Sequence, residues 1–256
     1  MRTSPRRTLT LALLGAGAAA GALGFLTTRS TPAMAAQDSA SAAAAPSIVM
    51  PLPSRPPAGA VVLFGGKSED LTANWYKRYS KDAPAWTVDK GVAVPKEKSD
   101  ITTKQEFGDC YLHVEFRTPV YPASDPNPGH GNSGVGLQGR YEIQILSDAG
   151  KEPGKSGSAS LYSQKASRVN VSKKPGEWQT YDIIFRAPRF DESGAVVEKP
   201  RATVFHNGVL VQNNEEFTGM TGIQYSEYKE MTKTGPIILQ GDHDPVQFRN
   251  IWVVPM

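Results

Sequence analysis

The chain has 256 residues, a formal net charge of +3 and a single cysteine. Because Cys110 has no second cysteine to pair with, an internal disulfide is excluded and packing alone must hold the fold. Cys110 falls in phase with the apolar residues of its segment, which predicts a small buried residue and not a nucleophile.

The N-terminal region is typical of a secretory signal peptide. Arg2, Arg6 and Arg7 precede the apolar run 9–26, and a small-residue cleavage site follows at 33–35. The Arg6-Arg7 pair favours the twin-arginine route, with ordinary secretion as the alternative. Glycines dilute the apolar run, which makes a membrane anchor the weaker interpretation. We therefore expect residues 1–35 to be removed and the mature protein to be secreted or to lie in the periplasm or on the exterior of the cell envelope.

Removal of the signal peptide changes the charge of the protein. Residues 1–35 contain four arginines and no acidic residue, so their loss from 28 basic residues leaves 24 against 25 acidic ones. This near-neutral balance predicts neither nucleic acid nor, after cleavage, a membrane as partner, and it favours a neutral ligand. Residues 36–59 are rich in Ala, Ser and Pro and predict a linker, which leaves 60–256 as the folded domain.

Residues 60–256 predict short β-strands separated by turns. Apolar or alternating runs occur at 61–64, 86–88, 92–94, 110–118, 179–187, 236–240 and 246–254. Asn207-Gly208 between two alternating runs is typical of a hairpin turn. No segment of useful length has the helical period. The pattern predicts an all-β fold, a sandwich of two antiparallel sheets. Common nucleotide, serine hydrolase and zinc motifs are absent, so we expect no cofactor to be required.

The stretch 130–148 is the richest in polar groups beside glycine. Between residues 141 and 147 the side chains alternate, so Ile143 and Ile145 point one way while Glu142 and Gln144 point the other. An ordinary exposed face is the simple interpretation, since Glu and Gln usually face water. Four glycines beside this strand instead favour close approach of a ligand. They are Gly131, Gly134, Gly136 and Gly139.

The domain resembles the 3-keto-disaccharide hydrolase domain family. The resemblance rests, in chain order, on Asn132-Ser133-Gly134, Tyr141-Glu142-Ile143-Gln144, Leu161-Tyr162, Gly176-Glu177-Trp178, Asn207-Gly208, Gly235 to Gln240 and Phe248 to Ile251. It implies a concanavalin-like jelly roll with its ligand on a concave sheet. It also implies activity on glycosides whose C3 hydroxyl is oxidised to a ketone, and an upstream dehydrogenase that performs this oxidation. One departure is Asp244, which follows His243 where the family has glycine.

A ketone at C3 acidifies the hydrogen on C2, so a base can remove it and the C1 substituent can leave. Glu142 or His243 is the candidate base, because carboxyl and imidazole groups are tunable toward neutral pH. Tyr162, or the other member of that pair, is the candidate acid. The predicted substrate-binding residues, some of which can donate to an enolate oxygen, are Asn132, Ser133, Arg140, Gln144, Gln240 and Arg249.

Several of these residues allow another interpretation. His243 can equally be an exposed turn histidine, and Arg249 can equally pair with Glu142 or with another carboxylate across the sheet. The acidic residues Asp148, Asp242 and Asp244 can instead hold a divalent cation such as calcium. The outward side chains of 110–118, which include His113, are expected to form a solvated face.

Two other functions compete with the enzyme suggested by the resemblance. A non-catalytic carbohydrate-binding module would use the same concave face but would need no group that moves protons. A glycosidase of the laminarinase type needs two acidic residues on either side of the scissile bond. The second such position on the strand is Gln144, which is neither acid nor nucleophile, so this third interpretation is the weakest.

Overall fold

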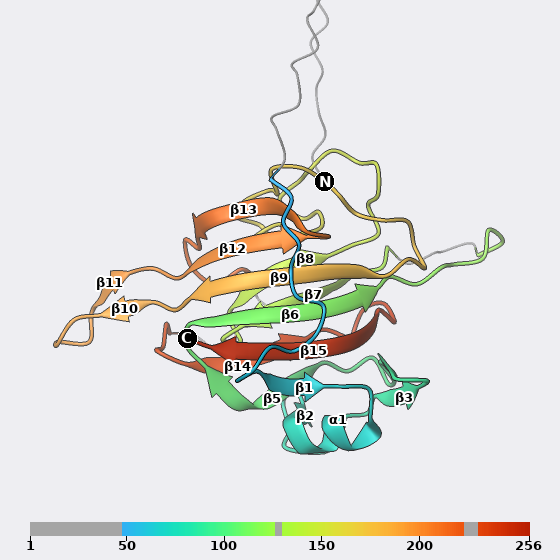
Figure 1. The fold of residues 1–256 in the computed structure, drawn as a ribbon, viewed down its shortest axis with the longest axis horizontal. Coiled ribbons are helices and arrows are strands. Elements are labelled where there is room, and N and C mark those ends of the chain that lie inside the picture. The colour runs from blue at the N-terminus through green and yellow to red at the C-terminus, as the bar shows by residue number, and fades with distance from the viewer. Residues whose placement is uncertain (1–47, 126–129, 223–229) are drawn as a thin grey trace, which may run out of the picture. The chain divides into compact units, whose positions relative to one another are not determined.

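The computed structural model describes residues 48–125, 130–222 and 230–256, which fold into two antiparallel sheets (Figure 1). Sheet A has the order β13-β12-β9-β6-β15-β4-β3, and β1 also pairs with β15. Sheet B has the order β2-β5-β14-β7-β8. In Figure 1, β9, β6 and β15 lie in front of β8, β7 and β14. The predicted all-β sandwich is confirmed.

The strands of sheet A are β1 (Val61–Phe64), β3 (Thr87–Asp89), β4 (Val92–Val94), β6 (Cys110–Arg117), β9 (Gln179–Arg186), β12 (Arg201–His206), β13 (Val209–Glu216) and β15 (Gln247–Pro255). Those of sheet B are β2 (Trp75–Lys77), β5 (Ile101–Phe107), β7 (Ser133–Leu137), β8 (Tyr141–Ile145) and β14 (Gly235–Leu239). A separate ribbon consists of β10 (Arg189–Phe190) and β11 (Val196–Glu198), and the short helix α1 (Ser68–Asn74) joins β1 to β2.

The hydrophobic core lies between the two sheets. Alternate residues of β6, from Cys110 to Phe116, point into it, as the sequence pattern predicts. Burial raises the pKa of the Cys110 thiol to about 12, so the thiol stays protonated and serves as a small apolar group. Across the core, the rings of Tyr141 and Phe185 lie 5.9 Å apart.

A buried tyrosine joins the two sheets at the strand that carries the candidate site. The Tyr181 hydroxyl, on β9, donates to the Gln144 carbonyl on β8 at 2.6 Å and accepts from the Ala159 N–H at 2.8 Å. A buried hydroxyl with both partners satisfied fixes the height of one strand relative to the other. The position of β8 is therefore set by the core, not by a loop.

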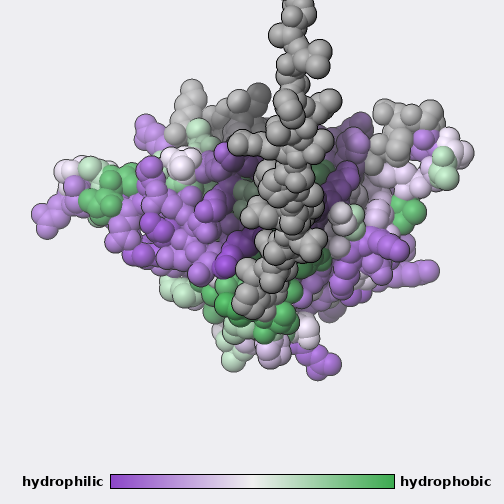
Figure 2. Space-filling view, turned by 90° about the horizontal axis from the view of Figure 1, so that it is seen from above, coloured by the Kyte–Doolittle hydropathy of each residue, from purple (hydrophilic) through white to green (hydrophobic). Residues whose placement is uncertain are grey.

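The hairpin predicted at Asn207-Gly208 joins β12 to β13. Both residues have positive φ, 53° for Asn207 and 79° for Gly208, as a type I′ turn requires. At the left of Figure 2, hydrophilic residues predominate around a small hydrophobic patch. Among the described residues, no helix is long and apolar enough to cross a bilayer.

The described part of the predicted linker lies along sheet A. Val49 forms a β-bridge with Val209, and the Asn250 side chain donates to the Ser54 carbonyl at 2.7 Å. Figure 1 shows this segment crossing the face of the sheet that is turned away from sheet B. His113, on that face, is only 2% exposed, so the expectation of a solvated face is wrong there. The reason is this N-terminal cover, which the periodicity of β6 does not reveal.

Candidate functional site

Two rows of side chains cross the outer face of sheet B, the face turned away from sheet A. Directly opposed residues of neighbouring strands share a face of the sheet, so the strand register defines each row. The first row is Arg78, Asp100, Gln240, Gly134 and Gln144. The second row is Tyr76, Thr102, Ile238, Gly136 and Glu142. The central hairpin of the sequence thus meets the residues around Gln240 on one surface.

Glu142 is held tightly on this face and is only 1% exposed. Its side chain lies over Gly134, where an added Cβ would be 2.9 Å from Glu142 Cδ and closer still to Oε1. The glycine on β7 therefore allows the carboxylate to approach the strand, the role expected of glycine in a strand beside a site. The Glu142 N–H donates to Thr221 Oγ1 at 3.0 Å, which fixes the backbone.

Tyr162 is brought beside Glu142 at the outer edge of β8. The bridge between Leu161 and Ile143 is antiparallel, and the Tyr162 N–H donates to the Glu142 carbonyl at 3.1 Å. Two of the three predicted catalytic residues are therefore neighbours. Tyr162 is partly exposed, whereas Glu142 is buried.

The turn after Gln240 is tied to the central hairpin. Gln144 Nε2 donates to Asn132 Oδ1 at 3.3 Å, and the Asn132 N–H donates to Asp244 Oδ2 at 2.7 Å. The other Asp244 oxygen accepts from the Tyr121 hydroxyl. His243 precedes Asp244 in this turn. Its side chain is 46% exposed, and its Nε2 lies 3.5 Å from Asp242 Oδ1. The His243 side chain is therefore half exposed, whereas Glu142 is buried.

A buried charge cluster beside this turn was not predicted. Arg78 Nη1 lies 2.6 Å from Asp100 Oδ2, and both side chains are at most 4% exposed. Asp100 Oδ1 accepts the backbone N–H of Gly241 at 2.9 Å and that of Asp242 at 3.2 Å. Burial and the nearby Asp100 carboxylate raise the pKa of Asp242. The cluster fixes the start of the turn that carries His243.

Three predicted substrate-binding residues lie elsewhere. Ser133 points to the core side of β7, and its hydroxyl donates to the Gln240 carbonyl at 2.9 Å. Arg140 is buried in the turn between β7 and β8 and donates to the carbonyls of Gln138 and Glu230. Arg249 lies on the outer face of sheet A.

The position of Arg249 follows one of the alternatives drawn from the sequence. Its Nε lies 2.6 Å from Glu115 Oε2, and its guanidinium lies 4.0 Å from the centre of the Trp178 ring. The arginine thus pairs with a carboxylate across its own sheet, not with Glu142. Within the motif around residue 249, Arg249 therefore forms its contacts on sheet A.

The acidic residues suggested for a cation do not gather in one place. Both oxygens of Asp148 accept hydrogen bonds, from the Ser158 N–H and the Ser172 hydroxyl, each at 2.7 Å. Asp148 thus orders its own loop, away from Asp242 and Asp244. Within the described ranges, no group of three or more His, Cys, Asp or Glu side chains could hold a metal ion.

Comparisons with known proteins show which family and which folds this chain is similar to. The model of a family described as the 3-keto-alpha-glucoside-1,2-lyase-like domain, the one the sequence resembles, matches residues 59–254. A search among curated proteins found no match.

Three solved structures from Parabacteroides distasonis, each named as a glycosyl hydrolase, are similar to this chain. The first is 36% identical, with a TM-score of 0.65, and the alignment covers 78% of this chain and 85% of the other. The second is 17% identical, with a TM-score of 0.56 and coverage of 77% and 94%. The third is 23% identical, with a TM-score of 0.52 and coverage of 77% and 99%. The last two support the fold alone.

Proposed function

Because the chain belongs to the 3-keto-alpha-glucoside-1,2-lyase-like domain family, we propose that it cleaves glycosides whose C3 hydroxyl has been oxidised to a ketone. The observation that carries this proposal is the buried Glu142 carboxylate, held over Gly134 beside Tyr162 and the amide groups of Gln144 and Gln240. A carbohydrate-binding site has no need of a buried carboxylate that accepts protons, whereas elimination depends on one.

In the proposed reaction, Glu142 removes the proton on C2 and the electron pair of that C–H bond forms an enolate with the C3 ketone. Amide N–H groups of the first row, from Gln144 and Gln240, stabilise the enolate oxygen. The bond from C1 to the leaving oxygen then breaks, and Tyr162 gives that oxygen a proton. Water can add across the resulting double bond: its oxygen bonds to C1, one of its protons returns to Tyr162, and the proton on Glu142 returns to C2.

In this proposal the protein acts outside the cytoplasm, after residues 1–35 have directed its export. Its substrate comes from a dehydrogenase that oxidises the C3 hydroxyl of the same sugar. Between the two candidate bases, burial favours Glu142, because proton transfer from carbon requires a fixed group shielded from water. His243, half exposed, is better placed to contact the leaving group.

The test compares an oxidised substrate with its parent. We expect the purified protein to cleave a 3-keto-glucoside and to leave the unoxidised glucoside intact, with product detected by chromatography. The same reactions with a chelator measure any dependence on a metal ion. Cleavage of both sugars at similar rates would support an ordinary glycosidase. Binding of both without cleavage would support a carbohydrate-binding module.

Substitution of Gly134 provides a second test of the site. Gly134→Ala is expected to lower kcat on a 3-keto-glycoside about 100-fold, because the new Cβ displaces the Glu142 carboxylate by a fraction of an ångström or more. The displaced atoms are the end of a flexible side chain, so the melting temperature should change little. Gly154→Ala is the matched control, because nothing lies within 4 Å of its added Cβ. Full activity in Gly134→Ala would show that the working carboxylate is not at residue 142.

A further inference from the structure

A hollow of about 740 Å³ lies at the β2 end of the outer face of sheet B. Neither the sequence motifs nor the proposed reaction assigns it a role. Two tyrosine rings, hydroxyl groups and charged side chains surround it. The residues that matter here are Tyr76, Arg78, Tyr79, Thr102, Lys104 and Glu106.

The two tyrosine rings are braced by cations. The Arg78 guanidinium lies 4.6 Å from the centre of the Tyr79 ring, and Asp100 holds that guanidinium in place. Lys104 Nζ lies 4.8 Å from the centre of the Tyr76 ring and donates to the Thr72 carbonyl at 2.7 Å. Contacts of this kind orient an aromatic ring.

Tyr79 is also unusual in its backbone and exposure. It has a φ of 65°, in the left-handed region that residues other than glycine seldom adopt, and it is 74% exposed. A large exposed ring held at a backbone outlier is a feature that clusters at binding sites. Tyr79 lines the hollow.

A hydroxyl in the wall of the hollow lacks a partner. Thr102 Oγ1 is shielded from solvent and forms no hydrogen bond with any described residue. Because this oxygen is shielded, a ligand in the hollow would contact the exposed side chains around it and not this hydroxyl. Aromatic faces combined with hydroxyl groups are the surface that a sugar ring, with its apolar face and polar edge, requires.

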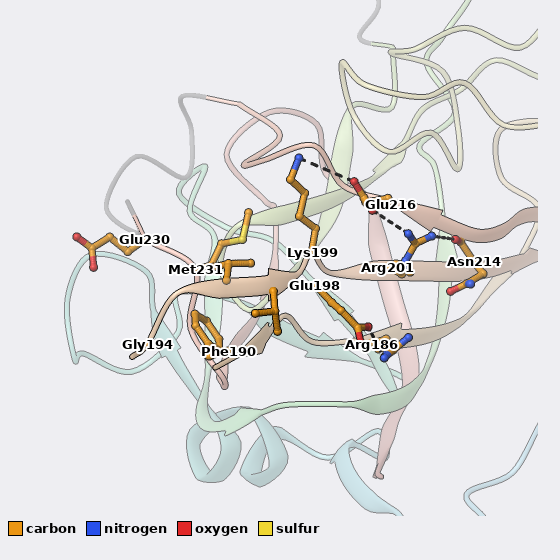
Figure 3. Close-up of a pocket in the computed structure, with 12 residues that line it drawn as sticks. Arg186, Phe190, Gly194, Glu198, Lys199, Arg201, Asn214, Glu216, Glu230 and Met231 are labelled. Atoms are coloured by element: carbon orange, nitrogen blue, oxygen red, sulfur yellow. Dashed lines mark hydrogen bonds and ion pairs between the residues drawn. The ribbon is translucent and has the colours of Figure 1, made fainter. Parts of the chain in front are cut away.

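A second hollow, of about 1040 Å³, lies at the β10–β11 ribbon and differs from the first in the residues that line it. Figure 3 shows that its charged side chains other than Glu230 are paired with one another. Arg186 pairs with Glu198, while Glu216 lies 2.8 Å from Arg201 and 3.9 Å from Lys199. Its lining offers one aromatic ring, that of Phe190, so it provides a control and not a site.

We propose that the hollow at β2 is a secondary carbohydrate-binding site for a neutral oligosaccharide chain. It is separate from the reacting centre: Tyr76 and Glu142 are four strand spacings apart, or about 19 Å, and Ile238 between them is fully buried. Arg78 is neutralised by Asp100, and Glu106 offsets one of the nearby lysines, so a neutral sugar fits better than an anionic one. The site would hold the enzyme on a sugar chain while cleavage takes place elsewhere.

The test uses unoxidised gluco-oligosaccharides, so its outcome does not depend on the proposed reaction. Hexasaccharides of the maltose, cellulose and laminarin series are titrated into the purified protein and followed by NMR or calorimetry. We expect at least one series to bind, and Tyr79→Asn to weaken that binding about threefold to tenfold. Asn is chosen because it tolerates positive φ.

Two further variants separate binding from folding. Thr102→Val should leave binding unchanged and the melting temperature unchanged or higher, because the hydroxyl it removes is shielded from the hollow and has no partner among the described residues. Phe190→Ala, in the other hollow, should bind as the wild type does. Failure of all three series to bind at millimolar concentration, or equal affinity in Tyr79→Asn and wild type, would overturn the proposal.

Discussion

Glu142→Gln is expected to lower kcat on a 3-keto-glycoside about 1000-fold while KM changes little. The amide cannot accept the C2 proton, and a positioned general base contributes about 100-fold to 10,000-fold to such a step. The two side chains have nearly the same shape, so the contact over Gly134 is kept. A loss confined to kcat is the result expected when an interaction of the transition state is removed.

Exchange of the C2 hydrogen with deuterated water measures the same step without the leaving group. We expect wild type to exchange this hydrogen in a 3-keto sugar that lacks a leaving group, and Glu142→Gln to exchange it far more slowly. Glu152→Gln, an exposed carboxylate outside the site, is the matched control. If Glu142→Gln kept both turnover and exchange, His243 would become the candidate base.

The faces of the central strands were predictable because alternation is a local property. Ile143 and Ile145 point into the core while Glu142 and Gln144 point outward, as the pattern of residues 141–147 indicates. The same reasoning placed Cys110 in the core. A pattern with period two reports which face a residue takes, but not what covers that face.

The rest of the site depends on strand register, which no local pattern encodes. Arg78 and Asp100 lie 22 positions apart and meet only because β2 pairs with β5. Arg249 occurs in a family motif, yet β15 belongs to sheet A, so the motif preserves a contact with Glu115 across that sheet. Burial of His113 follows from the segment 48–57, whose composition predicts only a linker. These features depend on which distant segments pair, and no local sequence pattern shows that pairing.

The stability of the domain is expected to peak near pH 6.5 and to fall on both sides, by about 2 kcal/mol at pH 9 and about 2 kcal/mol at pH 4.5. Two buried histidines cause this, and they act in opposite directions. His113 and His206 are 2% and 1% exposed. Their partners differ: carboxylates for the first, an amide for the second.

His113 accounts for the alkaline side. Burial acts to lower its pKa, but Asp182 Oδ1, 2.7 Å from Nδ1, and Glu115 raise it to about 9. The unfolded value is 6.5, so the folded state binds more protons between pH 6.5 and 9. Stability therefore falls as the pH rises through this range and is fully present below it. The pKa of Glu115 is lowered to about 2, so that carboxylate stays ionised throughout.

His206 accounts for the acid side. Burial lowers its pKa from 6.5 to about 3, and its Nε2 donates to Gln179 Oε1 at 2.9 Å as a neutral ring. Between pH 6.5 and 3 the unfolded state binds the proton that the folded state excludes. Stability consequently falls as the pH drops below 6.5, and above that value His206 costs nothing.

Urea unfolding at pH 4.5, 6.5 and 9 measures the loss of stability on the acid side and on the alkaline side. One variant isolates the contribution of each histidine. His206→Gln keeps a donor toward Gln179 and should flatten the acid side only. His113→Asn keeps a donor toward Asp182 and should flatten the alkaline side only, although it lowers stability at every pH. Each comparison is between slopes of the free energy of unfolding against pH. A general loss of stability in a variant therefore does not obscure the result. A wild-type stability that is level from pH 6.5 to 9 would mean that His113 is neutral, and that the ring between Asp182 and Glu115 is held by hydrogen bonds without the charge.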